Sequence, residues 1–182
     1  ENGASFDLVA SANIEYIARL VNQGLAISDS ADLYARGRIV LAVNKKAGVQ
    51  AVTLEDLLSD DIQYIAIANP EHAPYGAAAV AALRSAGVYE QFSRRLVIAE
   101  NVRQAQMFTE SGNTDLSIIA RSLAGRSGRF VEIPLNLHPP IVQTLAAVSG
   151  GNEAQAREFA DLLDTSLGRQ LLRDSGFLPP PS

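Results

Sequence analysis

Apolar residues follow two different periods along the chain, and the change of period separates strands from helices. Short apolar runs are followed by segments with apolar residues at i, i+3, i+4 and i+7, which is helical spacing. Two successive units show this best: a strand at 62–68 with a helix at 75–86, and a strand at 96–99 with a helix at 102–110. Strands that alternate with helices predict right-handed βαβ crossovers and a parallel sheet.

The remaining segments continue the alternation. We expect further strands at 6–10, 38–43, 116–119, 130–133 and 141–148. Two short helices are also expected, one that starts at a capping box of Thr53 with Asp56 and one at 120–124. Ser11 is the expected N-cap of a helix with Ile14, Ile17, Ala18 and Val21 on its apolar face. Two helices close the chain, the first capped by Asn152 with Phe159, Leu162 and Leu163 on its buried face, the second containing Leu167, Leu171 and Leu172.

The loop after strand 62–68 has the composition of an anion-binding turn. Pro70 and Pro74 lack N–H donors and fix their own φ, so neither the strand nor the helix extends across them. Gly76 has no Cβ, which lets the backbone at the helix start approach closely whatever lies beside it. The first-turn N–H groups of a helix have no intrahelical acceptor, and the helix dipole adds partial positive charge there. This loop therefore predicts an anion site at the start of the helix.

A second helix start is expected beside the first. Asn101 is a good N-cap for the helix at 102–110, and Gln104 can complete a capping box. Loops that follow parallel strands lie at one edge of the sheet, where ligands bind. The N–H groups at Tyr75 and Val102 are therefore expected to point into one crevice. Two helix N-termini suit a compact dianion without any Lys or Arg.

Composition narrows the possible partners. The net charge of −5 over 182 residues argues against nucleic acid, which needs clustered Lys and Arg. No apolar run approaches the roughly 20 residues of a membrane-spanning helix, so no membrane insertion is expected. The chain has no Cys and only two His, His72 and His138, which excludes thiolate metal sites and disfavours a multi-histidine one. We expect no cofactor and no metal held directly by side chains.

The sequence gives little support for a catalytic function. His72 has no Ser or Cys nucleophile with an orienting partner, and a role in holding the loop's shape is favoured. His138 precedes two prolines and is expected to be structural. The acids Asp7, Asp60, Asp61 and Asp115 lie at strand starts or turns, where acids usually cap turns. Neither a P-loop nor a dinucleotide-binding glycine motif is present.

The run IANPEHAPYG at residues 67–76 closely resembles the hallmark loop of periplasmic molybdate-binding proteins, the soluble receptors of molybdate ABC importers. Further similar runs follow the family's order along the chain: FDLVASA at 6–12, YARGRIVL at 34–41, DLSIIA at 115–120, LHPPI at 137–141 and RDSGFL at 173–178. The resemblance implies an α/β, two-lobed periplasmic-binding-protein fold with parallel-rich sheets flanked by helices. Residues 1–42 with 136–182 would form one lobe, incomplete at its N-terminus, and 43–135 the other.

The resemblance also implies a ligand set. The backbone N–H groups of Tyr75 and Val102 would each donate to the oxyanion, supported by Pro74, Gly76 and Asn101. One branch of the family adds a tyrosine hydroxyl from the segment matching 118–121, where this chain has Ala120. The remaining ligands would lie in loops upstream of Glu1. The family's N-terminal part is thus expected to be missing from this sequence.

The implied function is that of a periplasmic, or otherwise extracytoplasmic and membrane-associated, receptor. It would bind molybdate or tungstate between its lobes through neutral donors and deliver it to the membrane permease of an ABC importer. Two alternatives stay open: a receptor for another tetrahedral oxyanion such as sulfate, and a ligand-sensing domain of a transcription regulator.

Overall fold

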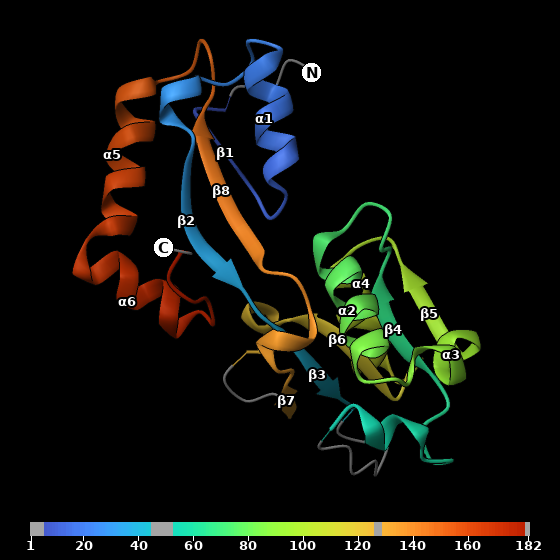
Figure 1. The fold of residues 1–182 in the computed structure, drawn as a ribbon. Helices are drawn as coiled ribbons and strands as arrows, with labels where there is room; N and C mark the ends of the chain where they lie inside the picture. The colour runs from blue at the N-terminus through green and yellow to red at the C-terminus, as the bar shows by residue number, and fades with distance from the viewer. Residues whose placement is uncertain (1–5, 45–52, 126–128, 181–182) are drawn as a thin grey trace. The chain divides into compact units, whose positions relative to one another are not determined.

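The structure, a computed structural model, describes residues 6–44, 53–125 and 129–180. The chain forms two compact units, which are described separately (Figure 1). Unit 1 consists of Glu1–Gly37 and Ile141–Ser182, and unit 2 of Arg38–Pro140. No helix in the described ranges has the length and apolar character that crossing a bilayer requires.

Unit 2 is built on a mixed five-stranded sheet. Its strands are β3 (Ile39–Val43), β4 (Ile65–Ala68), β5 (Leu96–Ala99), β6 (Leu116–Ala120) and β7 (Phe130–Glu132), in the order β5-β4-β6-β3-β7. β4 pairs in parallel with both β5 and β6, whereas β3 pairs antiparallel with β6 and β7. The parallel strands therefore end at one common edge of the sheet.

Two main helices connect the parallel strands of unit 2. α2 (Pro74–Ser85) and the short α3 (Tyr89–Phe92) lie between β4 and β5, and α4 (Val102–Ser111) lies between β5 and β6. The two crossovers run in opposite directions along the sheet. Right-handed connections consequently place α2 and α4 on opposite faces. Short 3₁₀ turns complete the unit, at Glu55–Leu58 (η2), Ser93–Arg95 (η3), Arg121–Leu123 (η4) and Leu135–Leu137 (η5).

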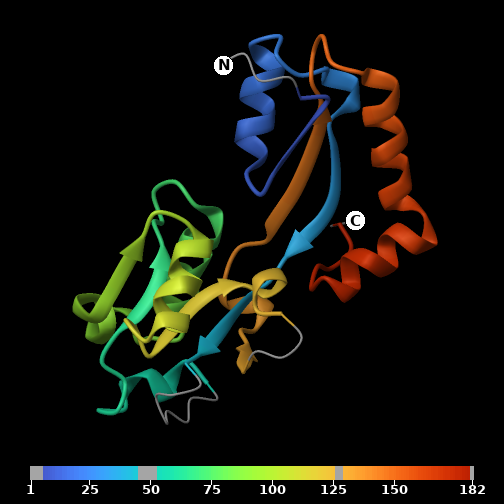
Figure 2. The ribbon, with the colours of Figure 1, turned by 180° about the vertical axis from the view of Figure 1, so that it is seen from behind.

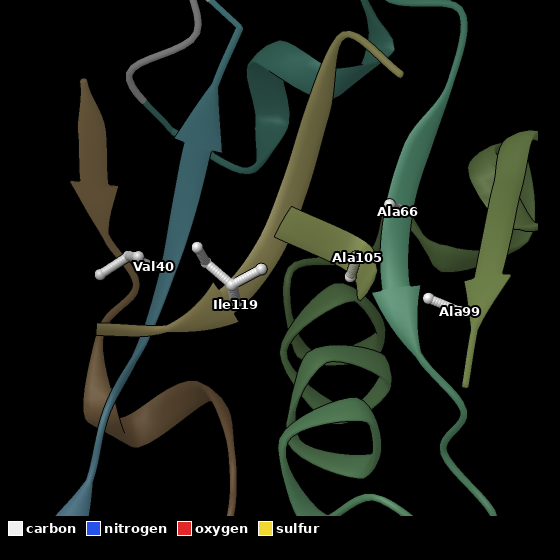
Figure 3. Close-up of a cluster of buried hydrophobic side chains, with 5 residues drawn as sticks. All are labelled: Val40, Ala66, Ala99, Ala105 and Ile119. Carbon is white, nitrogen blue, oxygen red and sulfur yellow. The ribbon is translucent and has the colours of Figure 1, made fainter. Parts of the chain in front are cut away.

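Small residues let α4 pack close to the sheet of unit 2. Ala66, Ala99 and Ala105 form a buried cluster with Val40 and Ile119, drawn in Figure 3. Every residue of β4 is fully buried, as expected for a central strand covered on both faces. The alternation of its side chains assigns Ala66 and Ala68 to the α4 face and Ile65 and Ile67 to the other. The core of unit 2 is thus closed on both sides of β4.

Unit 1 has a three-stranded antiparallel sheet. β8 (Ile141–Ala147) lies in the centre between β1 (Leu8–Ser11) and β2 (Asp32–Gly37). α1 (Ile14–Asn22) and α5 (Glu153–Asp164) lie on opposite sides of this sheet in both views (Figures 1 and 2). α6 (Ser166–Asp174) packs against α5, and η1 (Ser28–Ser30) precedes β2. The core under α1 contains Ile17, Ala26 and Ala146.

Several expectations need correction in unit 1. Asn13, not Ser11, caps α1, because its side chain accepts from the Glu15 N–H at 2.9 Å while Ser11 ends β1. The apolar pattern did not predict β2, because its sequence DLYARG lacks an apolar run and its first three positions are half-buried or exposed. Phe159 and Leu162 were expected to be buried but are 49% and 46% exposed. Ala156 is the one buried residue of α5.

The sheets and unit boundaries also differ from expectation in detail. Parallel pairing is present in β5-β4-β6, whereas β3 pairs antiparallel with β6 and β7, and β8 pairs antiparallel with β1 and β2. The lobes were expected to divide at 42/43 and 135/136. The two compact units divide at Gly37/Arg38 and Pro140/Ile141, because β3 pairs wholly within unit 2. That these units act as ligand-binding lobes stays a prediction.

Candidate anion-binding site

The loop between β4 and α2 folds around Asn69. Its carbonyl accepts from the N–H groups of His72 (3.3 Å) and Ala73 (2.9 Å), and its side chain accepts from the Glu71 N–H at 2.9 Å. Ala73 is the N-cap in an extended conformation and makes no side-chain cap bond. Pro74 is the first helical residue, where its missing N–H costs nothing. The loop therefore leads into the first turn of α2 with an N-cap residue whose side chain makes no cap bond.

Gly76 serves the packing of α2 on the sheet. The sequence suggested that its missing Cβ lets the backbone approach closely whatever lies at the helix start. In the structure a Cβ at this position would overlap the carbonyl oxygen of Ala68 and lie 3.0 Å from the Asn69 carbonyl carbon. The close neighbour is thus the end of β4. Gly76 fixes how near the first turn of α2 sits to the strand that precedes it.

The loop between β5 and α4 contains the predicted capping arrangement. Asn101 Oδ1 accepts from the Gln104 N–H at 2.9 Å, which confirms Asn101 as the N-cap. Gln104 Oε1 accepts in return from the N–H of Glu100, at 2.6 Å, one residue earlier than a capping box requires. Within the described residues the Val102 N–H makes no hydrogen bond. This amide is the first of α4 and is aligned with the helix dipole.

The two helix starts are neighbours at one edge of the unit 2 sheet. β4 and β5 are in register from Ile65 opposite Leu96 to Ala68 opposite Ala99, so both end at the same level. A backbone hydrogen bond from Asn69 N to Ala99 O, 2.7 Å long, ties the two loops together just beyond the strands. The structure therefore brings the segments of Tyr75 and Val102 together as the sequence predicted. Their role in holding a ligand stays a prediction.

The charged side chains in these two loops are not buried. Glu71, His72 and Glu100 are all exposed, and the His72 Nε2 lies 3.9 Å from a Glu71 carboxylate oxygen. Tyr75, in contrast, is only 8% exposed, so its ring packs inside unit 2. The arrangement offers backbone dipoles as its anion-attracting groups.

Sequence reasoning missed a charged cluster at the same edge. Glu132 Oε1 accepts from Arg121 Nε at 3.1 Å and lies 3.4 Å from Arg38 Nη1. Arg121 also stacks over the Phe130 ring, 4.1 Å from its centroid. These contacts direct the Arg121 guanidinium toward β7, away from β4 and β5. No local sequence pattern predicts this cluster, because its residues are far apart in sequence and only the β6-β3-β7 pairing brings them together.

The other residues weighed as catalytic have structural positions. The Asp115 carboxylate accepts from the N–H groups of Gln63 and Tyr64, and the Asp7 carboxylate accepts from the Asn152 N–H, so both acids hold distant segments of the chain together and neither caps its own turn. His138 is buried, and its Nδ1 donates to the Pro139 carbonyl at 2.8 Å. Asp60 and Asp61 are exposed. Among the residues that the structure describes, no three His, Asp or Glu side chains gather as metal ligands would.

Comparison with known proteins gives the family. The model of the family described as "Bacterial extracellular solute-binding protein" matches residues 1–178. The chain belongs to this family. It is 31% identical over 179 residues to the molybdate-binding protein ModA of Rhodobacter capsulatus, a match that covers 97% of this chain and 70% of that protein. It is also 28% identical over 180 residues to a putative ABC transporter substrate-binding lipoprotein of Bacillus subtilis, with 96% and 68% covered.

A solved structure of a molybdate-binding protein has the same fold. The periplasmic molybdate-binding protein of Azotobacter vinelandii superposes with a TM-score of 0.86 at 30% identity, covering 99% of this chain and 81% of that one. The resemblance to molybdate-binding proteins that the loop at 67–76 indicated is thereby confirmed, together with the expected α/β periplasmic-binding-protein fold. The sulfate-binding protein of Mycobacterium tuberculosis, at 18% identity and a TM-score of 0.74, shares the fold alone.

Proposed function

We propose that this chain is an extracytoplasmic receptor that binds molybdate and delivers it to the membrane permease of an ABC importer. One observation carries the proposal: the similarity to the Rhodobacter capsulatus molybdate-binding protein extends over 97% of the chain at 31% identity. Membership in a family of extracellular solute-binding proteins favours a receptor over the sensing domain of a transcription regulator. It equally favours transport over catalysis.

The binding chemistry that we propose uses the two helix starts of unit 2. The backbone N–H groups of Tyr75 and Val102 each donate one hydrogen bond to an oxygen of the anion. Pro74 and Gly76 fix the position of the first turn of α2, and the Asn101 cap fixes that of α4. Aligned amides at two helix N-termini stabilise a dianion without any counter-charge from Lys or Arg.

Neutral donors also give the site its selectivity. Molybdate is fully deprotonated at neutral pH, so each donor finds an oxygen lone pair. Phosphate at the same pH retains a proton, and its O–H would face donors that cannot accept it. Sulfate carries no proton and would be rejected by its smaller size. Tungstate has nearly the size of molybdate, and we propose that it binds as well.

The two units supply the scaffold of the receptor in this proposal. We infer that unit 2 is one lobe and unit 1 the other, with the crossings at Gly37/Arg38 and Pro140/Ile141 as hinges. The donors beyond Tyr75 and Val102 would come from other loops of the receptor.

Isothermal titration of the purified protein with molybdate, tungstate, sulfate and phosphate tests the proposal. We expect saturable binding of molybdate and tungstate and none of phosphate. Binding of sulfate alone would instead support the receptor for a smaller oxyanion. Binding of phosphate with an affinity equal to that for molybdate would contradict the neutral-donor chemistry, and absence of binding to all four anions would contradict the receptor function of this chain.

A further inference from the structure

Two arginines lie at the same edge of the unit 2 sheet as the proposed anion site. β4 and β6 run in parallel with Ile67 opposite Ile118, so the two strands end at nearly the same level. Arg121 is the first residue after β6, and its backbone N–H donates to the carbonyl of Arg38, which directly precedes β3, at 2.9 Å. Figure 3 shows β3, β6 and β4 in this order across the sheet. The backbone of Arg121 therefore lies one strand away from the loop that leads into α2.

The turn that contains Arg121 is close to both helices of the site. α2 packs on β6 as well as on β4. The side chain of Gln106 on α4 donates to the carbonyl of Leu123 in η4 at 3.1 Å. Neighbouring strands are about 4.8 Å apart, and an extended arginine side chain is longer than this spacing. The Arg121 guanidinium thus has the length to reach the loop after β4 when no contact holds it elsewhere.

Contacts with β7 hold this guanidinium on the other side. Arg121 Nε donates to Glu132 Oε1 at 3.1 Å, and the same carboxylate oxygen lies 3.4 Å from Arg38 Nη1. The guanidinium also lies over the Phe130 ring, 4.1 Å from its centroid. Glu132 and Phe130 both belong to β7, which β3 and β6 separate from β4. The Arg121 side chain is only 20% exposed, so these contacts enclose most of it.

We propose that Glu132 is a positioning residue for anion selectivity. It holds the Arg121 guanidinium against β7 and thereby keeps cationic donors away from the starts of α2 and α4. This inference rests on the proposed function, because it concerns the donors of the same site. Its subject is a residue that never touches the anion and acts through Arg121.

The physical reason lies in the difference between fixed and mobile donors. Backbone amides at two helix starts are fixed, so they fit only an anion whose oxygens match their spacing, and this match separates molybdate from the smaller sulfate. A guanidinium on a long side chain follows the oxygens of either anion, and its charge strengthens each hydrogen bond that it donates. A released Arg121 would therefore favour sulfate more than molybdate. The Glu132 contact prevents this.

Glu132→Gln tests the proposal, because it removes the negative charge and nearly preserves the shape of the side chain. Titration calorimetry with molybdate and with sulfate should show that the ratio of the two affinities falls about tenfold, the effect of one hydrogen bond from a charged donor. Glu132→Gln combined with Arg121→Gln should restore the wild-type ratio, since the released cation is then absent. A merely structural role of the ion pair predicts no such restoration.

A matched control separates this local effect from the change in net charge. Glu153 in unit 1 pairs with Arg157 at 2.8 Å and has a side chain 47% exposed, close to the 45% of Glu132. Glu153→Gln removes the same charge from the chain and should leave the ratio of affinities unchanged. Thermal unfolding followed by circular dichroism checks that every variant folds.

A second measurement needs no molybdate. The arginine Nε–H groups are observed by nitrogen-15 NMR, and the resonance of Arg121 is identified by its loss in Arg121→Gln. Its exchange with water should accelerate at least about tenfold in Glu132→Gln, because a proton exchanges faster when its hydrogen bond opens. Added sulfate should shift this resonance in Glu132→Gln and leave it unchanged in the wild-type protein.

Three results would overturn the proposal. The first is a ratio of affinities in Glu132→Gln equal to that in Glu153→Gln. The second is a changed ratio that the added Arg121→Gln substitution does not restore. The third is an Arg121 Nε–H that exchanges equally fast with and without Glu132. A wild-type protein that binds no molybdate would instead contradict the proposed function, and the Nε–H measurement would still decide whether Glu132 holds Arg121.

Discussion

Two helices of equal length show how differently the two units are completed. α2 in unit 2 and α5 in unit 1 both have 12 residues. Seven residues of α2 are buried, whereas α5 buries only Ala156. The difference does not follow from amphipathicity, because α5 has the sharper apolar stripe in its sequence. Burial depends on what lies opposite a face, and unit 2 supplies it while the described part of unit 1 does not.

A central strand of unit 2 and an outer strand of unit 1 repeat the contrast. β4 has strands on both sides and helices on both faces, so every one of its residues is buried. β1 has one neighbouring strand and retains an exposed residue, Ala10. Eight of the thirteen large apolar side chains that are exposed among the described residues belong to unit 1, the smaller unit. Stability should therefore reside mainly in unit 2.

Truncating one phenylalanine in each unit gives the largest expected difference. Phe92 in unit 2 is fully buried, and Phe92→Ala should cost about 3–5 kcal/mol of unfolding free energy, as in other cores. Phe159→Ala removes the same atoms from a half-exposed site and should cost less than about 1 kcal/mol. Urea unfolding followed by circular dichroism measures both. Equal losses would mean that Phe159 is buried in the protein in solution and would break the contrast.

Gly76→Ala tests how rigidly the first turn of α2 is held against the end of β4 in unit 2. The added Cβ would meet the backbone of Ala68, which no side-chain rotation can relieve, so we expect a loss of about 1–3 kcal/mol. Ala77→Gly, the neighbouring control, has an exposed site and should cost only about 1 kcal/mol through helix propensity. Thermal unfolding distinguishes them. A stabilised Gly76→Ala protein would show that α2 can move off the end of β4.

The smallest stability effects come from two equivalent caps. Asn101 caps α4 in unit 2, and Asn152 caps α5 in unit 1, each through its side-chain oxygen. Replacement by Ala should cost about 0.5–2 kcal/mol in either case. Only Asn101→Ala should also weaken molybdate binding, because its cap orients the Val102 amide. Titration calorimetry on both variants measures this, and equal affinities would separate the cap from the site.

Local patterns predicted most elements of the fold. The caps at Asn101 and Asn152, the Thr53–Asp56 capping pair and the junction at 67–76 were all found from residue types at fixed spacings, because their interactions are local. The structure then placed Tyr75 and Val102 on neighbouring loops as βαβ geometry requires. Sequence reasoning identified the helix starts but could not identify the end of β4 as the backbone that lies close to Gly76.

The features that escaped prediction depend on distant residues. The cluster of Arg38, Arg121 and Glu132 exists only because β3 lies between β6 and β7. β2 has too few apolar residues for its pattern to predict a strand. Its pairing with β8 stabilises the strand instead. The exposure of Phe159 and Leu162 could not be foreseen from their spacing, since periodicity marks a face that can be buried and not the partner that buries it.

The most direct test of the proposed site removes one backbone N–H. Val102→Pro deletes the amide at the first position of α4, where proline is well tolerated, and Asn101 already has the extended conformation (φ −151°, ψ 172°) that a following proline requires. Val102→Ala keeps the amide and serves as the control. We predict by calorimetry that Val102→Pro binds molybdate about tenfold to a hundredfold more weakly than Val102→Ala, the effect of losing one hydrogen bond to a charged group. Equal affinities for the two variants would contradict the account.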